Sequence, residues 1–249
     1  FTKRIMKIDY KNKHVLITGG SRGIGNNLAN AFFLSGANVI STSTKPFKIK
    51  NSKAKNQWIN FVVDFNNDDS ISEFTKNLKM FKKIDILINN AGINKINEIN
   101  RINNNDWDEI NRINLRAPYL MTKLVSKIMI KQKKGYIVNM SSIFGVISKE
   151  KRAAYSASKS GLIGLTKACS IDLAKYNILV NSVSPGFVET ELTKKILSIK
   201  DTVLLKNNVP LKRFAKKEEI TNLLFFLCSK YNTYITGQNI IIDGGFTLK

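Results

Sequence analysis

Short apolar runs alternate with segments of helical spacing along almost the whole chain. The apolar runs predict strands at residues 14–18, 38–42, 58–63, 84–88, 135–140, 178–183 and 239–242. Between them, apolar residues recur every three to four positions, as in a helix with one buried face. These segments predict helices near residues 28–34, 69–80, 105–131, 153–175, 190–205 and 216–229. Residues 45–57 are polar and rich in lysine, and they predict a loop or a frayed helix.

This alternation indicates the fold class. Parallel strands need crossover connections, and helices commonly supply them. No internal repeat or linker divides the sequence, so residues 1–249 are expected to form one domain. The predicted fold is α/β: a single Rossmann-type, doubly wound domain whose central parallel sheet of about seven strands is flanked by helices.

A glycine-rich loop joins the first predicted strand to the first predicted helix. It reads Thr18-Gly19-Gly20-Ser21-Arg22-Gly23-Ile24-Gly25. Glycines here allow a tight turn and let main-chain N–H groups approach an anion at the start of a helix. Because the loop follows a strand and precedes a helix, it predicts a site for the pyrophosphate of a dinucleotide.

The end of the second predicted strand bears on which dinucleotide binds. An acidic residue there would bond the ribose 2′-hydroxyl and repel a 2′-phosphate. The chain instead has Ser41-Thr42-Ser43-Thr44-Lys45, with Arg22 in the opposite loop. Hydroxyls and cations favour NADP(H), and NAD(H) is the alternative. Asp64, after the third predicted strand, either contacts the adenine or caps the strand end.

Tyr155 precedes Lys159 by four residues in a predicted helix, so the two side chains share one face. A tyrosine of ordinary pKa, about 10, is a poor acid or base near neutral pH, and a nearby cation lowers that pKa. The pair suits a proton donor. A tyrosine in the core beside a lysine in water has the same spacing, so the pair alone does not decide.

In combination, the motifs of this chain resemble those of the short-chain dehydrogenase/reductase family. The resemblance extends from Thr18 to Gly245. Its motifs are Thr18-Gly-x-x-x-Gly-x-Gly25, Asn89-Asn90-Ala91-Gly92, Asn114, Ser142, Tyr155-x-x-x-Lys159 and Pro185-Gly186. The resemblance implies an NAD(P)-dependent oxidoreductase that couples hydride transfer to proton transfer at a carbonyl group.

The resemblance also implies the catalytic roles. Tyr155 would protonate the substrate oxygen, Ser142 would bond that oxygen, and Lys159 would lower the pKa of the tyrosine and hold the ribose. Asn114 would hold a water that links Lys159 to solvent. Ser141 competes with its neighbour, but the thirteen-residue spacing to Tyr155 favours Ser142.

The resemblance implies a cofactor site formed by residues from several loops. The segment from Pro185 to Thr190 would lie beside the carboxamide group of the nicotinamide. The full set is Thr18, Gly19, Ser21, Arg22, Gly23, Ile24, Gly25, Thr44, Asp64, Asn90, Ala91, Gly92, Tyr155, Lys159, Pro185, Gly186, Val188 and Thr190. No metal site is expected, because His14 is the only histidine and Cys169 and Cys228 are far apart in the sequence.

Within the family, the chain is most similar to 3-oxoacyl-carrier-protein reductases, through Ser21 to Gly25, Gly161-Leu-Ile-Gly164 and Val209-Pro-Leu-Lys-Arg213. Those reductases usually carry a Gly/Asn/Gln-rich loop where this chain has Ile147-Ser-Lys-Glu-Lys-Arg152. The expected substrate is a carbonyl compound, either a small molecule or bound to a carrier protein, and a 3-oxoacyl thioester is favoured. A sugar or other secondary alcohol stays open, as does a non-catalytic nucleotide-binding protein. Residues 190–208 are expected to form a substrate lid.

The formal charge of +22 at first suggests a nucleic-acid partner. Most of the basic residues are lysines scattered along the chain, so no specific nucleic-acid binding is expected. Lys131, Lys133 and Lys134 either attract an acidic carrier protein or form a solvated helix end.

The expected environment is the cytoplasm, without membrane insertion. No apolar run reaches the ~18 residues that a membrane span needs. The first residues, Phe1 to Lys7, also lack the features of a signal peptide. The family resemblance further implies a homotetramer.

Overall fold

A parallel sheet forms the centre of the computed structural model, which describes residues 8–49, 56–191, 193 and 198–248. In this part of the chain the sheet has seven strands in the order β3-β2-β1-β4-β5-β6-β7. The strands are β1 His14–Ile17, β2 Asn38–Ser43, β3 Trp58–Val62, β4 Ile86–Asn89, β5 Gly135–Met140, β6 Ile178–Pro185 and β7 Asn239–Ile242. All neighbouring strands are parallel, which confirms the predicted fold class.

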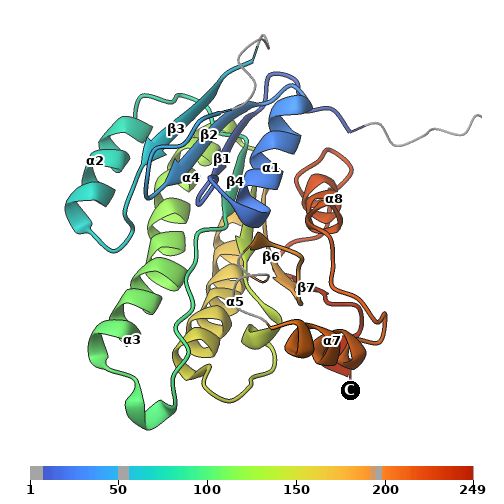
Figure 1. Ribbon diagram of the computed structural model, residues 1–249. Coiled ribbons are helices and arrows are strands. Elements are labelled where there is room, and N and C mark those ends of the chain that lie inside the picture. The colour runs from blue at the N-terminus through green and yellow to red at the C-terminus, as the bar shows by residue number, and fades with distance from the viewer. Residues whose placement is uncertain (1–7, 50–55, 192, 194–197, 249) are drawn as a thin grey trace, which may run out of the picture.

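Helices connect the strands and cover both faces of the sheet (Figure 1). They are α1 Gly23–Leu34, α2 Asp68–Leu78, α3 Asn104–Asn111, α4 Ala117–Gln132, α5 Ala153–Ala174, α7 Ile199–Asn208 and α8 Lys217–Leu227. The chain winds from β1 outward to β3, then returns to β4 on the other side of β1. This reversal creates a crevice beyond the carboxyl ends of β1 and β4, where doubly wound folds bind ligands.

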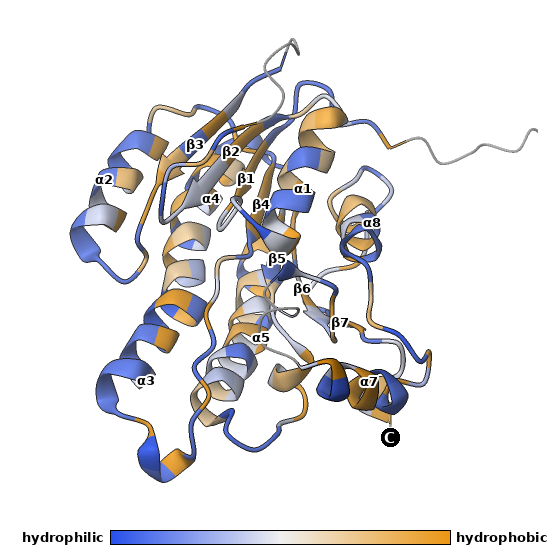
Figure 2. Ribbon diagram, in the orientation of Figure 1, coloured by the Kyte–Doolittle hydropathy of each residue, from blue (hydrophilic) through white to orange (hydrophobic). Residues whose placement is uncertain are grey.

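Alternate residues of each inner strand enter two separate cores. Val15 and Ile17 pack with α1 and α8, whereas Leu16 between them packs with α2 and α4. This is the two-residue period of a strand that is buried on both faces. Figure 2 accordingly shows hydrophobic residues concentrated in the central strands and hydrophilic residues along much of α2 and α3.

Two surface helices begin at asparagine caps. The Asn67 side chain accepts a hydrogen bond from Ser70 N at 2.9 Å at the start of α2. The Asn103 side chain accepts one from Asp106 N at 2.7 Å at the start of α3. Each cap satisfies a main-chain N–H that has no partner within its own helix, and so fixes where the helix begins.

The predicted long helix over 105–131 is interrupted in the structure. A π-helical turn, Arg112–Arg116, separates α3 from α4. Its hydrogen bonds skip one more residue than those of an α-helix, so the apolar spacing alone does not reveal it. The turn carries Asn114, which places this candidate residue at a local irregularity rather than in a regular helix.

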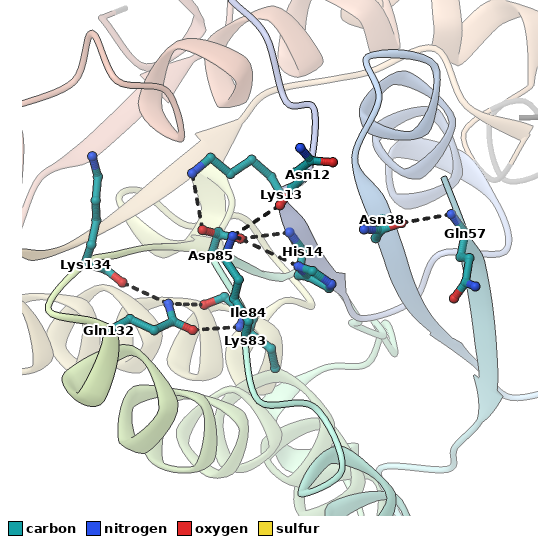
Figure 3. A network of polar contacts seen from close by, with 10 residues as sticks. All are labelled: Asn12, Lys13, His14, Asn38, Gln57, Lys83, Ile84, Asp85, Gln132 and Lys134. Atoms are coloured by element: carbon teal, nitrogen blue, oxygen red, sulfur yellow. Dashed lines mark hydrogen bonds and ion pairs between the residues drawn. The ribbon is translucent and has the colours of Figure 1, made fainter. Parts of the chain in front are cut away.

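The strand predicted at 84–88 begins two residues later, at Ile86. Gln132 at the end of α4 accepts a hydrogen bond from Ile84 N at 2.9 Å and donates one to Ile84 O at 3.0 Å. Ile84 is therefore paired with a side chain instead of a neighbouring strand (Figure 3).

Asp85, directly before β4, joins β1 to β4 at the amino-terminal ends of these two central strands (Figure 3). Its carboxylate accepts a hydrogen bond from His14 N at 2.9 Å and lies 3.3 Å from Lys13 Nζ and 3.4 Å from Lys83 Nζ. These contacts fix the register of the two strands whose other ends border the crevice.

The predicted helix over 190–205 overlaps α7, which begins at Ile199, and residues 191 and 193 before it are also helical. Residues 192 and 194–197 of the expected lid lie outside the described residues. The lid over 190–208 and the single domain over 1–249 remain predictions. Within the described ranges, no helix is both long and apolar enough to cross a membrane.

Candidate active site

The glycine loop between β1 and α1 has a shape that side chains would prevent. Gly19 and Gly23 have positive φ angles of 70° and 58°. A Cβ on Gly25 would lie 2.2 Å from Gly19 O and 2.4 Å from Asn90 Nδ2. The loop therefore presents main-chain N–H groups, with no intervening side chain, at the N-terminus of α1.

This loop forms one wall of a cleft of about 330 Å³ at the carboxyl ends of the strands. The cleft is lined by Gly19, Ser21, Arg22, Gly23, Ile24, Gly25, Thr42, Ser43, Thr44, Val63, Asp64, Phe65, Asn90, Ala91, Gly92, Ile93, Ile113, Thr190 and Glu191. Glycines, main-chain donors and apolar walls fit a dinucleotide whose pyrophosphate lies at the helix N-terminus. Most of the predicted cofactor residues lie in this lining.

Other predicted cofactor residues lie behind or beside the cleft. Thr18 Oγ1 accepts hydrogen bonds from Asn90 N at 2.9 Å and Ala91 N at 3.0 Å, so it fixes the opposite wall. Pro185, Gly186 and Val188 belong to the segment at the end of β6 that leads to Thr190. A Cβ on Gly23 would be 4.0 Å from Thr190 Cγ2, so this segment comes within van der Waals contact of the glycine loop.

The hydroxyls at the end of β2 are not equivalent. The Ser41 hydroxyl donates to Asn60 Oδ1 at 2.8 Å, and the Ser43 hydroxyl donates to Lys45 O at 2.7 Å. Thr42 Oγ1 accepts from Gly19 N at 3.2 Å. Thr44 is exposed and lines the cleft together with Arg22.

The first asparagine of the Asn89-Asn90-Ala91-Gly92 motif faces the interior. Asn89 Nδ2 donates to Asn139 Oδ1 at 2.8 Å, and Asn139 Nδ2 donates to Thr166 Oγ1 at 2.9 Å. This buried chain of hydrogen bonds connects β4, β5 and α5. It holds the cleft side of the motif against the helix that carries Tyr155 and Lys159.

The Ser142 side chain lies close enough to the Tyr155 hydroxyl to oppose the rise of the tyrosine pKa. Ser142 Oγ also accepts a hydrogen bond from Phe144 N at 3.2 Å, which holds the serine at the start of a short 3-10 turn. The competing Ser141 hydroxyl donates to Lys159 O at 3.0 Å. The two serines therefore differ: Ser142 acts on the tyrosine hydroxyl, whereas the Ser141 hydroxyl is bonded to the main chain of α5.

Lys159 lies one helical turn after Tyr155, with Nζ 5.7 Å from the centre of the tyrosine ring. Nζ donates a hydrogen bond to Met140 O at 2.7 Å. The side chain is buried, and this burial lowers the pKa of Lys159 to about 8.

The pKa of Tyr155 lies above its ordinary value because burial disfavours the phenolate. The hydrogen bond with Ser142 and the positive charge of Arg152 oppose this effect without reversing it. This result corrects the expectation of a lowered tyrosine pKa. In this structure the Lys159 ammonium points to Met140 O, and the largest effect on the tyrosine is desolvation.

Asn114 lies in the π-helical turn, and its side chain is fully buried. Its Oδ1 accepts from Ile93 N at 2.8 Å, while Nδ2 donates to Ile93 O at 2.9 Å and to Ser158 Oγ at 3.1 Å. A Cβ on Gly92 would lie 3.2 Å from Asn114 Oδ1 and 3.4 Å from Lys159 Nζ. Asn114 and Lys159 therefore meet beside Gly92, which lines the cleft. That Asn114 holds a water remains a prediction.

The sequence did not single out several residues of this region. Val63, Phe65, Ile93 and Ile113 supply apolar walls of the cleft, and their apolar character gave no signal beyond that of a core residue. Arg152 affects Tyr155 electrostatically. It lies in the stretch 147–152, whose departure from the reductase pattern was the available signal.

The fold and the site define a class of protein: a nucleotide-dependent oxidoreductase of the Rossmann type. A family model described as enoyl-(acyl carrier protein) reductase matches residues 19–247. The chain belongs to the short-chain dehydrogenase/reductase family and is an NAD(P)-dependent oxidoreductase.

Curated relatives cover nearly the whole chain. It is 40% identical over 243 residues to the 3-oxoacyl-[acyl-carrier-protein] reductase FabG of Buchnera aphidicola subsp. Schizaphis graminum, covering 96% of this chain and 98% of that protein. It is 38% identical over 251 residues to FabG of Aquifex aeolicus, covering 96% and 99%.

Solved structures show the same fold. A 4-hydroxyisoleucine dehydrogenase complexed with NADH has a TM-score of 0.88 and 32% identity, over 96% of this chain and 100% of that one. A short-chain type dehydrogenase/reductase from Mycobacterium marinum has a TM-score of 0.86 and 29% identity, over 97% and 98%.

Proposed function

We propose that this protein uses NADPH to reduce the 3-oxo group of an acyl thioester to a secondary alcohol. The observation that carries the proposal is the position of Tyr155, whose ring centre lies 5.7 Å from Lys159 Nζ beside the cleft residue Gly92 and whose hydroxyl is affected by Ser142. A carbonyl oxygen placed against both hydroxyls has one donor to orient it and one donor to protonate it.

The residues of the chain would divide the proton chemistry among them. When bound, a reduced nicotinamide supplies the hydride for the carbonyl carbon. Tyr155 gives its hydroxyl proton to the carbonyl oxygen and becomes a phenolate. The hydroxyl is protonated at neutral pH, and Ser142 and the charge of Arg152 lower its pKa against the larger opposing effect of burial. Lys159 stabilises the phenolate, and Ser142 holds the oxygen while charge develops.

The preference for NADPH is supported by the end of β2. The exposed Thr44 hydroxyl and Arg22 both line the cleft there, and no carboxylate occurs between Ser41 and Lys45. A 2′-phosphate would meet a donor and a cation instead of the negative charge that selects NADH.

Two observations support an acyl thioester. Both FabG relatives are named for 3-oxoacyl groups on acyl carrier protein. Phe187, in the segment after β6, packs on Phe144, Phe214 and Phe246 with ring centres 6.4, 5.4 and 5.2 Å away. This aromatic cluster adjoins the turn that follows Ser142 and offers an apolar surface to an acyl chain.

A second candidate is the dehydrogenation of a sugar or other small secondary alcohol with NAD(P). The specific observation in its favour is the polar stretch 147–152, which replaces the loop usual in acyl reductases. A non-catalytic nucleotide-binding role is less consistent with four converging catalytic side chains. The description of the family model adds enoyl reduction as an activity to test.

A substrate panel distinguishes these functions. NADPH oxidation is followed with acetoacetyl thioesters of carrier protein and of N-acetylcysteamine, a crotonyl thioester, and simple ketones and sugars. We expect the acetoacetyl thioesters to give the highest kcat/KM, with NADPH used better than NADH. A higher kcat/KM with crotonyl thioester, sugars or simple ketones would contradict the substrate proposal. Tighter binding of NADH would contradict the cofactor proposal.

A further inference from the structure

A chain of side-chain hydrogen bonds joins β2 to β3 next to the dinucleotide cleft. Trp58 Nε1 donates to Ser41 Oγ at 2.9 Å, and the Ser41 hydroxyl donates to Asn60 Oδ1 at 2.8 Å. Asn60 Nδ2 then donates to Ser43 Oγ at 2.8 Å, and the Ser43 hydroxyl donates to Lys45 O at 2.7 Å. The chain of bonds therefore starts at the first residue of β3 and ends at a main-chain carbonyl beyond β2, with Asn60 at its centre.

The direction of these bonds is fixed at both ends. The indole N–H of Trp58 can only donate, and the carbonyl of Lys45 can only accept. Each serine hydroxyl between them therefore accepts one bond and passes its single hydrogen onward, and one orientation of the Asn60 amide serves both serines. The Trp58 ring packs on Phe33 of α1 and on Phe47, with ring centres 5.9 and 6.0 Å away, so the donor that starts the chain of bonds is held in place.

These bonds decide which hydroxyls at the end of β2 are available to a ligand. Ser43 and Thr44 both line the cleft. The only hydrogen of the Ser43 hydroxyl goes to Lys45 O, so this side chain has no donor left for a phosphate. The Ser41 side chain is fully buried and its hydroxyl is bonded to Asn60. A phosphate at this end of the cleft therefore depends on the exposed Thr44 as its hydroxyl donor.

The same bonds fix the turn that carries Thr44. Ser43 is the last residue of β2, and its carbonyl accepts a hydrogen bond from Val63 N at 2.8 Å. Two residues later the chain is held again, by the bond from the Ser43 hydroxyl to Lys45 O, so Thr44 lies between two tethered residues. Asn60 supports this tether, because its amide N–H holds the Ser43 oxygen against β3.

Building on the proposed preference for NADPH, we propose that Asn60 is a positioning residue for cofactor selection. Asn60 is not among the residues that line the cleft, so it acts through the Ser43 hydroxyl that it holds on Lys45 O. Through that bond it places Thr44 in the cleft lining, which also contains Arg22. This placement serves the 2′-phosphate of NADPH, which NADH lacks, so Asn60 matters for one nucleotide and little for the other.

The test compares nucleotides that differ by one phosphate group. Fluorescence titration gives the affinities of the wild type and of Asn60→Ala for NADPH and NADH. Adenosine 2′,5′-bisphosphate and adenosine 5′-monophosphate, used as competing ligands, repeat the comparison without the nicotinamide. We expect Asn60→Ala to weaken binding of NADPH and of the bisphosphate by about threefold to tenfold, since an uncharged hydrogen bond contributes on this scale. Binding of NADH and of the monophosphate should change by less than about twofold, and so should kcat at saturating NADPH.

Asn38→Ala is the matched control. Asn38 also joins β2 to the chain entering β3, because its Oδ1 accepts from Gln57 N at 2.9 Å, but it lies at the opposite end of β2 (Figure 3). We expect this variant to lower the unfolding free energy without changing the ratio of the NADPH and NADH affinities. Equal weakening of both nucleotides in Asn60→Ala, or the same change of ratio in Asn38→Ala, would overturn the proposal.

Ser43→Ala tests the path from Asn60 to the turn independently. It removes both the acceptor of the Asn60 amide and the donor to Lys45 O. We expect the same selective loss of NADPH affinity, and no further loss in the double variant, because the two side chains act through one path. Additive losses would contradict that path. The variant also keeps the proposal testable should Asn60→Ala not fold.

The wild type separates this proposal from the one on which it rests. Tighter binding of NADH than of NADPH by the wild type would refute the proposed cofactor. A wild-type preference for NADPH that persists unchanged in Asn60→Ala would refute the role of Asn60 alone.

Discussion

Lys159 Nζ donates a hydrogen bond to the main-chain carbonyl of Met140 at 2.7 Å. Met140 is the last residue of β5 and comes directly before Ser141 and Ser142. The bond therefore attaches the lysine of α5 to the strand end that carries the serine. It holds a buried ammonium near the tyrosine ring, at the cost of desolvating it.

The first prediction concerns this buried lysine and pH. Burial lowers the pKa of Lys159 to about 8 from an ordinary value of 10.5, so the unfolded chain binds more protons between these pH values. Stability that Lys159 costs at pH 7 is therefore regained as pH rises. A methionine at this position cannot titrate, so the variant lacks this gain. Between pH 7 and pH 10 we therefore expect the unfolding free energy of the wild type to rise by about 2 kcal/mol relative to that of Lys159→Met.

Urea unfolding of both proteins at several pH values measures this change. The comparison removes the titrations that the two proteins share. A gap in unfolding free energy that stays constant from pH 7 to pH 10 would show that Lys159 is not desolvated in the folded protein. The same titration predicts that the reductive rate of the wild type falls above about pH 8, as Lys159 loses its proton.

A second prediction concerns cofactor choice. Thr44→Asp places a carboxylate at the end of β2, inside the cleft. We expect it to weaken NADPH binding roughly tenfold to a hundredfold through repulsion of the 2′-phosphate, while NADH binding changes little. Nucleotide fluorescence titration measures both affinities. Equal weakening of NADPH and NADH by Thr44→Asp would refute the assignment.

A third prediction uses two glycines in different surroundings. Gly25→Ala forces a Cβ to within 2.2 Å of Gly19 O, so we expect it to abolish dinucleotide binding and to lower the unfolding free energy by about 1–3 kcal/mol. Gly164 in α5 has no heavy atom within 4 Å of such a Cβ. Gly164→Ala should raise the unfolding free energy by about 0.5–1 kcal/mol. Calorimetry and nucleotide titration check both, and tight cofactor binding by Gly25→Ala would contradict the loop geometry.

A fourth prediction concerns assembly. Ile171 on α5 is 77% exposed and Tyr119 on α4 is 44% exposed, although both are large apolar side chains. We propose that these helices pair across one two-fold axis of a homotetramer and that the β7 region meets across another. Light scattering at micromolar concentration should give the mass of four chains. A monomer would refute the proposal, and Ile171→Glu should shift the equilibrium toward smaller species.

The sheet could be predicted from the sequence because both of its faces are buried. Continuous apolar runs such as Val15 to Ile17 occur where neighbouring residues enter opposite cores. The interruption of the helix over 105–131 could not be predicted from the sequence, since a π-helical turn changes the hydrogen-bond register without changing the apolar spacing. The start of β4 depended on Gln132, a contact across 48 residues of sequence.

The residues of the candidate site could be predicted where a sequence motif specifies them. Properties that depend on contacts between distant segments, such as burial and pKa, could not. Asn114 and Lys159 lie beside Gly92, and Tyr155 lies near both Lys159 and Ser142, while the catalytic roles of the four residues stay predictions. The sign of the tyrosine pKa shift was not predictable, because it depends on how deeply the phenol is buried. The lack of hydrogen-bond partners for Nε and Nη1 of Arg152 among the described residues was equally unpredictable, since it depends on every segment that folds around the side chain.

The most direct test of the central claim is the turnover of Tyr155→Phe with NADPH and acetoacetyl thioester. This substitution removes one hydroxyl from the pair formed with Ser142 and keeps the ring. We predict that kcat falls by about 10²- to 10⁴-fold while NADPH binding is retained, because proton donation by a positioned side chain contributes on this scale. Undiminished turnover in Tyr155→Phe would contradict the assignment of Tyr155 as the proton donor.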